Sequence, residues 1–292
     1  MKRWQIVLIV ILSVCGIAIG YALNNYYAPP AERQAYTIPR HHDDTLRIAY
    51  IGDSWAAFHN EHRCSLSQII SNRLQRPVKV TSFGLPGKTS KEIYESLFNH
   101  SKMRTLMTQG CDFCFISAGI NDTYKKMSTE YYKKSMDFII QFMLTNNIRP
   151  IILEIPDYDI IRAYNRQQPS RRWLRMFSIL ITGTPIDCKN EFRNTLMELI
   201  FYKNYHDSVD LISYQEWNLH YVDDLKAYYV GDGMHLNQKG YDKLDSCLAM
   251  HIIVQTSTNT ANDSTVLSYV TREKPTIHPQ VRSQSQKRPS NN

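Results

Sequence analysis

A short apolar segment, residues 46–51, ends abruptly at Gly52-Asp53-Ser54. A buried strand followed by a tight turn at glycine is where an α/β fold exposes a nucleophilic serine. A serine at such a turn also caps the first turn of a helix, and a three-residue match often arises by chance. The turn therefore predicts either a nucleophile or a helix cap, and partner residues elsewhere decide between the two.

An acid and an imidazole lie three residues apart toward the other end of the chain, at Asp232 and His235. A serine hydroxyl needs a general base to remove its proton at neutral pH, and histidine suits that role. The carboxylate then holds the imidazole in the required tautomer and stabilises its protonated form. His220, with Asp223 and Asp224, is the alternative, but it lacks the helix start Asn237-Gln238-Lys239-Gly240 that follows His235.

Two further segments offer donors for the negative charge that develops during acyl transfer. Asn121 follows the apolar strand 113–116 and presents a side-chain amide. Gly87 lies in a Gly/Pro loop where the backbone amide can approach a substrate closely. With the amide of Ser54, these groups predict an oxyanion hole. Gly84 in the same loop is the alternative to Gly87, and an ordinary turn is another interpretation of the loop.

These four segments resemble the blocks of the SGNH hydrolases, also called GDSL-type esterases and lipases. In chain order they are Gly52-Asp53-Ser54, Gly87-Lys88-Thr89, Gly119-Ile120-Asn121-Asp122 and Asp232-Gly233-Met234-His235. The resemblance covers residues 46–256. It implies Ser54 as nucleophile, Asp232 and His235 as the rest of the triad, and Gly87 and Asn121 as oxyanion donors. It implies neither a metal nor an organic cofactor.

Three positions depart from the usual pattern of that family. Trp55 follows the serine where a small aliphatic residue is frequent, Ser82 stands where asparagine is frequent, and Leu236 replaces a frequent proline. None of these changes removes a catalytic group. Trp55 is expected either to pack its helix or to shape an acyl or sugar pocket.

Apolar and amphipathic segments alternate through the middle of the chain. Strands are expected at 46–52, 78–83, 112–117, 150–155 and 209–214, and helices near 65–75, 90–99, 129–146 and 191–203 and after His235. Such alternation predicts an α/β fold, a three-layer α/β/α sandwich with a mainly parallel central sheet. Catalytic loops leave the carboxyl ends of such strands, where the first three motif segments lie.

The N-terminal residues 1–23 contain an uncharged run from Trp4 to Leu23, behind Lys2 and Arg3. About 20 helical residues reach roughly 30 Å, enough to span a bilayer. The positive charges should stay cytoplasmic, which places the remaining chain outside the cytosol. We expect a retained single-pass anchor in the cell membrane. The alternative is a cleaved signal peptide, which would give a secreted protein.

Three regions lie outside the alternating pattern. Residues 24–45, rich in tyrosine, proline and charge, predict a tether. An arginine-rich and aromatic insertion at 157–188 predicts a lid or a binding wall for a sugar or acidic group, or else an amphipathic helix with solvated arginines. Residues 257–292 are polar and basic and predict a disordered tail. With 43% hydrophobic residues, the 292-residue chain is expected to form one large domain between tether and tail.

The cysteines and two histidines lead to weaker expectations. Outside the anchor the cysteines number five, so an oxidising compartment leaves at least one thiol free unless chains pair: Cys64, Cys111, Cys114, Cys188 and Cys247. Cys114 is expected to be buried in its strand. His59 and His62 are expected at the surface rather than as metal ligands.

The sequence thus predicts a serine esterase that acts through an acyl-serine intermediate. The expected substrate is an O-acetyl or short acyl ester of a cell-envelope or dietary carbohydrate. A membrane-tethered O-acyltransferase acting on envelope glycans and a non-catalytic glycan-binding domain are the alternatives. The net charge of +7 comes with no nucleic-acid motif, so nucleic acid is not an expected partner, and the oligomeric state stays open.

Overall fold

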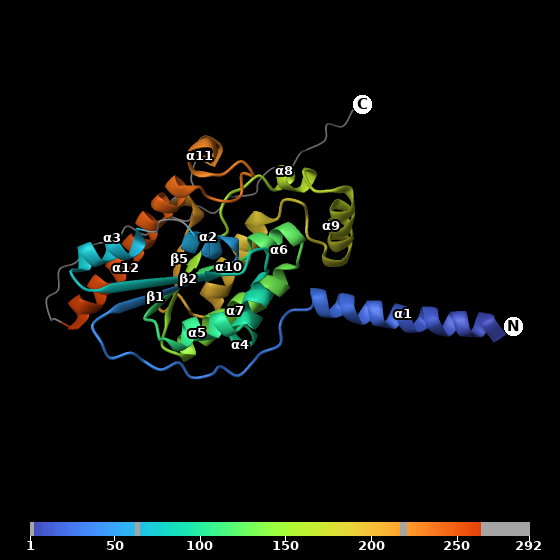
Figure 1. Ribbon diagram of the computed structural model, residues 1–292, viewed down its shortest axis with the longest axis horizontal. Coiled ribbons are helices and arrows are strands. Elements are labelled where there is room, and N and C mark those ends of the chain that lie inside the picture. The colour runs from blue at the N-terminus through green and yellow to red at the C-terminus, as the bar shows by residue number, and fades with distance from the viewer. Residues whose placement is uncertain (1–2, 62–64, 217–220, 264–292) are drawn as a thin grey trace, which may run out of the picture. The chain divides into compact units, whose positions relative to one another are not determined.

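The computed structural model describes residues 3–61, 65–216 and 221–263 (Figure 1). Five parallel strands form one sheet in the order β2-β1-β3-β4-β5. They are β1 (Leu46–Gly52), β2 (Val78–Gly84), β3 (Phe113–Ser117), β4 (Arg149–Leu153) and β5 (Asp210–Ile212). Each overlaps a predicted strand, and the predicted α/β class with a parallel central sheet is confirmed.

Helices cover both faces of this sheet. One layer contains α2 (Ser54–Glu61), α3 (Leu66–Leu74) and α12 (Gln238–Asp263), and the other contains α4 (Ser90–Asn99), α5 (Ser101–Thr108), α7 (Thr129–Thr145) and α10 (Lys189–Tyr202). The connections carry α6 (Ile120–Lys125), α8 (Ile160–Asn165), α9 (Pro169–Thr182), the 3₁₀ turn η1 (Tyr214–Glu216) and α11 (Tyr221–Tyr228). Because both faces are covered, the central strands β1 and β3 are almost wholly buried and apolar.

The carboxyl ends of three neighbouring strands lie level with one another. Gly52 at the end of β1 pairs with Gly84 of β2 on one side and with Ser117 of β3 on the other. A Cβ on Gly52 would lie 2.2 Å from the Ser117 carbonyl oxygen, and one on Gly84 would lie 2.1 Å from the Ala57 amide nitrogen. Glycine therefore allows the close packing that brings the following loops to one edge of the sheet.

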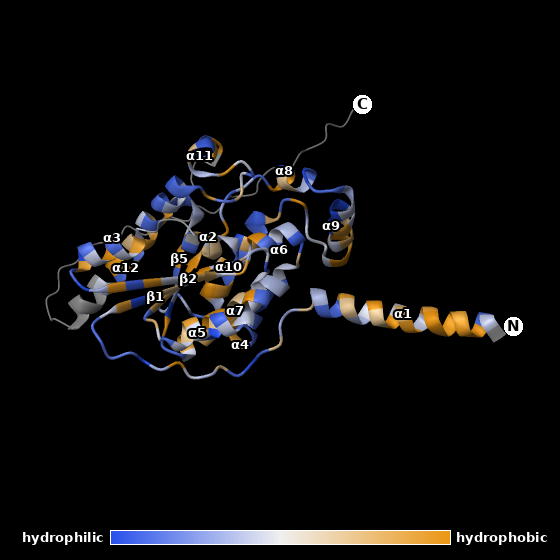
Figure 2. Cartoon of the chain, viewed as in Figure 1, coloured by the Kyte–Doolittle hydropathy of each residue, from blue (hydrophilic) through white to orange (hydrophobic). Residues whose placement is uncertain are grey.

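The N-terminal helix α1 (Arg3–Tyr27) is, among the described residues, the one helix long and apolar enough to cross a membrane. Its apolar side chains are exposed, and Figure 2 shows hydrophobic residues along most of its length. The segment predicted as a tether then packs against the domain: Ile38 is buried, and its amide donates to Asn146 Oδ1 at 2.7 Å.

At the other end, α12 continues to Asp263, past the predicted domain boundary at residue 256. The rest of the predicted tail, 264–292, lies outside the described residues, as do His62, Cys64 and His220. The described cysteines are free thiols: Cys15, Cys111, Cys114, Cys188 and Cys247. Cys114 is buried, as predicted. Burial raises the pKa of Cys111 to about 12, so that thiol is protonated and unreactive near neutral pH.

Candidate active site

Ser54 is the first residue of α2, and Asp53 alone separates it from the end of β1. The amides in the first turn of a helix have no intrahelical acceptor, and the helix dipole favours negative charge there. Asp53 takes up one of these amides, because its Oδ1 accepts a hydrogen bond from the Trp55 amide at 3.0 Å. Ser54 itself is 6% exposed, so its hydroxyl lies at the edge of the buried turn.

His235 connects Ser54 to Asp232 through hydrogen bonds at both ring nitrogens. Its Nε2 lies 2.9 Å from Ser54 Oγ, and its Nδ1 lies 2.6 Å from Asp232 Oδ2. Asp232 Oδ1 accepts from the backbone amides of Met234 and His235 at 2.8 and 3.0 Å. Burial opposes ionisation of Asp232, but these hydrogen bonds hold its pKa below the ordinary value. The predicted serine, base and acid are therefore brought together, with an ionised carboxylate behind the imidazole.

The loop that carries this acid and base is fixed at both ends. Tyr229 and Leu236 form an antiparallel bridge, and the Val230 amide donates to the His235 carbonyl at 2.9 Å. Asn237 Oδ1 then accepts an amide from the first turn of α12 at 3.0 Å. Leu236, which departs from the family pattern, is buried under this loop and leaves the position of His235 intact.

Residues four apart in α2 share one face of the helix, and its two faces have different surroundings. Ser54 and Phe58 face the site, where the Phe58 ring meets the His235 ring edge-on at 5.0 Å between centroids. Trp55 faces the core at 1% exposure, and its carbonyl accepts from the Tyr241 hydroxyl of α12 at 3.1 Å. Trp55 therefore packs the helix and does not line a substrate pocket.

His59 is buried at 2% exposure, so the surface position predicted for it is wrong. Its Nε2 lies 2.7 Å from Asp245 Oδ1 and its Nδ1 lies 2.8 Å from Ser82 Oγ. Because both ring nitrogens have polar partners, the imidazole can be buried at low cost. Asp245 lies on α12, so this pair joins the helix that begins with Ser54 to the helix that follows His235.

Asn121 lies in the first turn of α6, next to the turn that carries Ser54. Its side-chain nitrogen is 3.5 Å from Asp53 Oδ2. The preceding Gly119 has a φ of +117°, and a Cβ there would lie 2.7 Å from the side chain of Ile155. Only glycine fits this turn without strain, and the turn directs Asn121 toward the end of β1.

Gly87 occupies the third position of the turn 85–88, which is closed by the Lys88 amide donating to the Leu85 carbonyl at 3.1 Å. Its φ of +75° is the value that glycine provides in such a turn. A Cβ on Gly87 would meet no heavy atom within 4 Å, whereas Gly84 is enclosed against α2. The open surroundings of Gly87 favour it over Gly84 as the glycine whose amide a ligand can reach.

Asp122 is a site residue whose role the sequence does not reveal. Its fully buried carboxylate accepts from the Ser90 amide at 2.8 Å and from the Ser90 hydroxyl at 2.6 Å. Ser90 begins α4, immediately after the loop of Gly87. Asp122 therefore ties that loop to the turn that carries Asn121. Its place in the Gly119-Ile120-Asn121-Asp122 motif is the signal in the sequence.

The two buried carboxyl groups beside the site titrate near neutral pH. Burial raises the pKa of Asp53 to about 7, against the hydrogen bond from Trp55, and the charge of Asp122 adds to the rise. Burial also raises the pKa of Asp122 to about 6, although hydrogen bonds from Ser90 oppose the shift. The charges of Asp53 and Asp122 beside the site therefore change near neutral pH.

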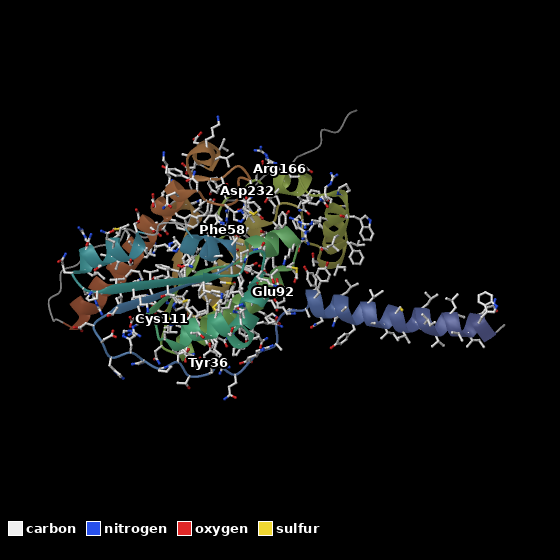
Figure 3. The ribbon with its side chains drawn as sticks, in the orientation of Figure 1. Tyr36, Phe58, Glu92, Cys111, Arg166 and Asp232 are labelled. Carbon is white, nitrogen blue, oxygen red and sulfur yellow. The ribbon has the colours of Figure 1, made fainter. Side chains whose placement is uncertain are left out.

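The insertion predicted at 157–188 forms α8 and α9. Arg166, between these helices, donates to the Gly231 carbonyl at 3.4 Å, beside Asp232 (Figure 3). The insertion thus reaches the loop of the acid and base. Arg175 is buried with its guanidinium over the Tyr124 ring at 5.6 Å, so the prediction of solvated arginines is wrong at that position.

Among the described residues, one group of side chains has metal-ligand geometry. Ligand atoms of Glu216, Cys247 and His251 lie within 4.8 Å of one another. The group shares no residue with the triad, and His251 Nε2 already lies 2.8 Å from Glu216 Oε2 as an ion pair. This pairing explains the cluster without an ion.

Solved structures share the fold of this chain. No protein-family model matches the sequence, and no curated protein is similar enough to match it. A lipase/acylhydrolase from Enterococcus faecalis superposes with a TM-score of 0.50 at 18% identity, covering 72% of this chain and 96% of that one. An acetyl xylan esterase superposes with a TM-score of 0.51 at 16% identity, covering 71% of this chain and 100% of that one. The chain therefore has the α/β fold of the SGNH hydrolases, as its motifs predict.

Proposed function

We propose that this protein is a serine esterase whose nucleophile is Ser54. The observation that carries the proposal is the continuous hydrogen-bond chain from Ser54 Oγ through His235 to Asp232. In the proposed reaction His235 Nε2 takes the Ser54 proton while Ser54 Oγ bonds to the ester carbonyl carbon. Collapse of the tetrahedral intermediate expels the alcohol, which receives that proton from His235. Water, deprotonated by His235, then attacks the acyl-serine carbonyl. Collapse of this second tetrahedral intermediate breaks the bond to Ser54 Oγ, which takes the proton back from His235, and releases the acid.

The oxyanion of each tetrahedral intermediate is proposed to be held by three donors: the amides of Ser54 and Gly87 and the side chain of Asn121. All three follow strands whose carboxyl ends lie level in the sheet, so the donors can converge on one point. Asp53 and Asp122 are proposed to position these donors. Asp53 holds the helix start through Trp55, and Asp122 holds the Gly87 loop through Ser90.

The proposed substrate is an O-acetyl or short acyl ester of a carbohydrate. One solved structure with this fold is an acetyl xylan esterase, which supports a small acyl group on a sugar. The insertion beside the acid and base contributes arginine and aromatic side chains, the residues that commonly contact sugars and acidic groups. Such an ester belongs to an envelope or dietary glycan, in keeping with a catalytic domain outside the cytosol.

We also propose that α1 is a retained anchor, single-pass, with Lys2 and Arg3 in the cytoplasm. Its length and mainly apolar composition support a span, and the positive charges at its start support this orientation. The backbone at the end of the span is held by the domain, because Lys91 Nζ donates to the Asn25 and Ala28 carbonyls at 2.8 and 2.9 Å.

The experiment that tests this function is an ester panel on the purified full chain. We expect the highest kcat/KM on acetyl to butyryl esters, lower values on palmitoyl esters, and release of free acetate from acetylated xylan. The His235→Ala variant controls for background hydrolysis. Preference for the palmitoyl ester, or equal rates for both proteins, would overturn the proposal. If adding an acceptor sugar replaces free acetate with a new sugar ester, the enzyme is an acyltransferase.

A further inference from the structure

The helix α9 is amphipathic, and its apolar side faces away from the protein. Residues at helical spacing form that side, with Leu180 at 79% and Trp173 at 71% exposure. We call it the outward face of α9; it consists of Trp173, Leu174, Met176, Phe177, Leu180 and Ile181. The Trp173 and Phe177 rings stack on one another at 6.0 Å between centroids.

The polar side of α9 is the side that packs on the protein. Ser178 and Arg175 are buried, and Thr182 Oγ1 donates to the Lys126 carbonyl at 3.0 Å. This is the reverse of a helix on a water-soluble surface, which buries its apolar stripe and exposes its polar one. Figure 2 shows both kinds of residue on α9. A contiguous exposed apolar face such as this one is typical of a surface that contacts a membrane or another protein.

The location of α9 identifies what covers it. The Tyr27 hydroxyl, at the end of α1, lies 2.7 Å from the Ser178 hydroxyl of α9. The candidate span Trp4–Tyr27 ends at that same residue, so α9 lies where the chain would leave the membrane (Figure 1). A helix at that level meets phospholipid headgroups and the first methylene groups of the acyl chains.

We propose that the outward face of α9 binds the membrane surface as an interfacial helix next to the anchor. Tryptophan is suited to this boundary, because its ring is apolar and its N–H is polar. Arg171 is exposed and Arg172 half-buried beside the apolar face, and their charges attract anionic phospholipid headgroups. Through Arg166 and Gly231 the same insertion contacts the loop of the acid and base, so this binding fixes how the candidate active site faces the membrane. The inference rests on the proposed anchor and not on the esterase chemistry.

The test uses two native tryptophans as depth reporters in the full chain. The protein is reconstituted in nanodiscs of phosphatidylcholine and phosphatidylglycerol, with or without brominated acyl chains, which quench nearby tryptophans. The difference between wild type and Trp173→Phe isolates the emission of Trp173. The difference between wild type and Trp4→Phe isolates Trp4, which reports on the anchor alone. We expect brominated lipid to remove most of both signals.

Two charge variants complete the design. Leu180→Glu is expected to abolish the quenching of Trp173 and leave that of Trp4 unchanged. Phe201→Glu on α10, at an exposed apolar residue outside α9, is the matched control and should change neither. Quenching of Trp4 but not of Trp173 would overturn membrane binding by the outward face of α9 and would leave the anchor supported. In that case, two protein copies per disc would show that a second chain covers α9. Absence of quenching at both Trp4 and Trp173 would overturn both the membrane-binding face of α9 and the anchor.

Discussion

His235 Nε2 lies 2.9 Å from Ser54 Oγ, although 181 residues separate them in the chain. Ser54 begins α2, and His235 lies just before α12. These two helices belong to the same layer and are joined by buried polar contacts. The fold, rather than any local segment, therefore brings Ser54 and His235 together.

Removing the base should remove turnover. We expect His235→Ala to lower kcat on a short acyl ester by roughly 10²–10⁴-fold or more, because Ser54 then keeps its proton. Adding Asp232→Asn to His235→Ala should cause little further loss, since the two act as a unit. The control is His220→Ala, which should retain near-normal kcat. A large loss of kcat in the His220 variant with a small loss in the His235 variant would identify His220 as the base.

Asn121 should matter in the transition state and not in substrate binding. We expect Asn121→Ala to lower kcat by roughly 10²–10³-fold with little change in KM, because a donor to the oxyanion is lost. Asn99→Ala, at an exposed asparagine that ends α4, is the matched control. A rise in KM at unchanged kcat would assign Asn121 to substrate binding instead.

The buried pair of His59 and Asp245 should contribute to stability. We expect His59→Leu to lower the free energy of unfolding by about 3 kcal/mol, because the buried Asp245 Oδ1 loses the imidazole, while Oδ2 keeps the Ser65 and Leu66 amides. Denaturant unfolding measures this change. His251→Leu breaks a partly exposed pair with Glu216 and should cost at most about 1 kcal/mol. Equal costs for the two variants would show that the buried pair has no special role.

Asp53 should make the protein less stable as pH rises. Its carboxyl keeps its proton in the folded state up to about pH 7, whereas the unfolded carboxyl ionises near its ordinary pKa of 3.8. The folded state therefore binds more protons between these values, and the free energy of unfolding falls as pH rises through that window. Relative to wild type, Asp53→Asn should gain about 2–3 kcal/mol between pH 5 and pH 8.

The control for this pH dependence is Asp207→Asn, which removes the same charge from an exposed side chain. Its stability relative to wild type should stay flat over the same pH range. An Asp53→Asn difference that is equally flat would show that Asp53 is ionised in the folded protein at pH 5.

The sheet and the triad could be predicted because their signals are local. Strands β1 and β3 are buried on both faces, so they appear in the sequence as short apolar runs. Each run ends at a motif, and the carboxyl ends of parallel strands meet at one edge of a sheet. The separate motifs of Ser54, Gly87 and Asn121 could therefore be placed together from the amino-acid sequence alone.

The features that sequence reasoning missed depend on partners distant in the chain. His59 can be buried because its Nε2 lies 2.7 Å from Oδ1 of Asp245, a residue 186 positions later in the chain. Nothing near His59 indicates that partner. The insertion shows the same limit, since helical periodicity predicts that α9 is amphipathic but not which side packs on the protein.

The central claim is that Ser54 is a nucleophile activated by His235, and one labelling experiment tests it most directly. A fluorophosphonate probe forms a covalent bond only with an activated serine. We predict that it labels the full-length wild-type protein, that labelling falls to background in Ser54→Ala, and that a mass increase maps to the peptide containing Ser54. Equal labelling of wild type and Ser54→Ala would contradict the account.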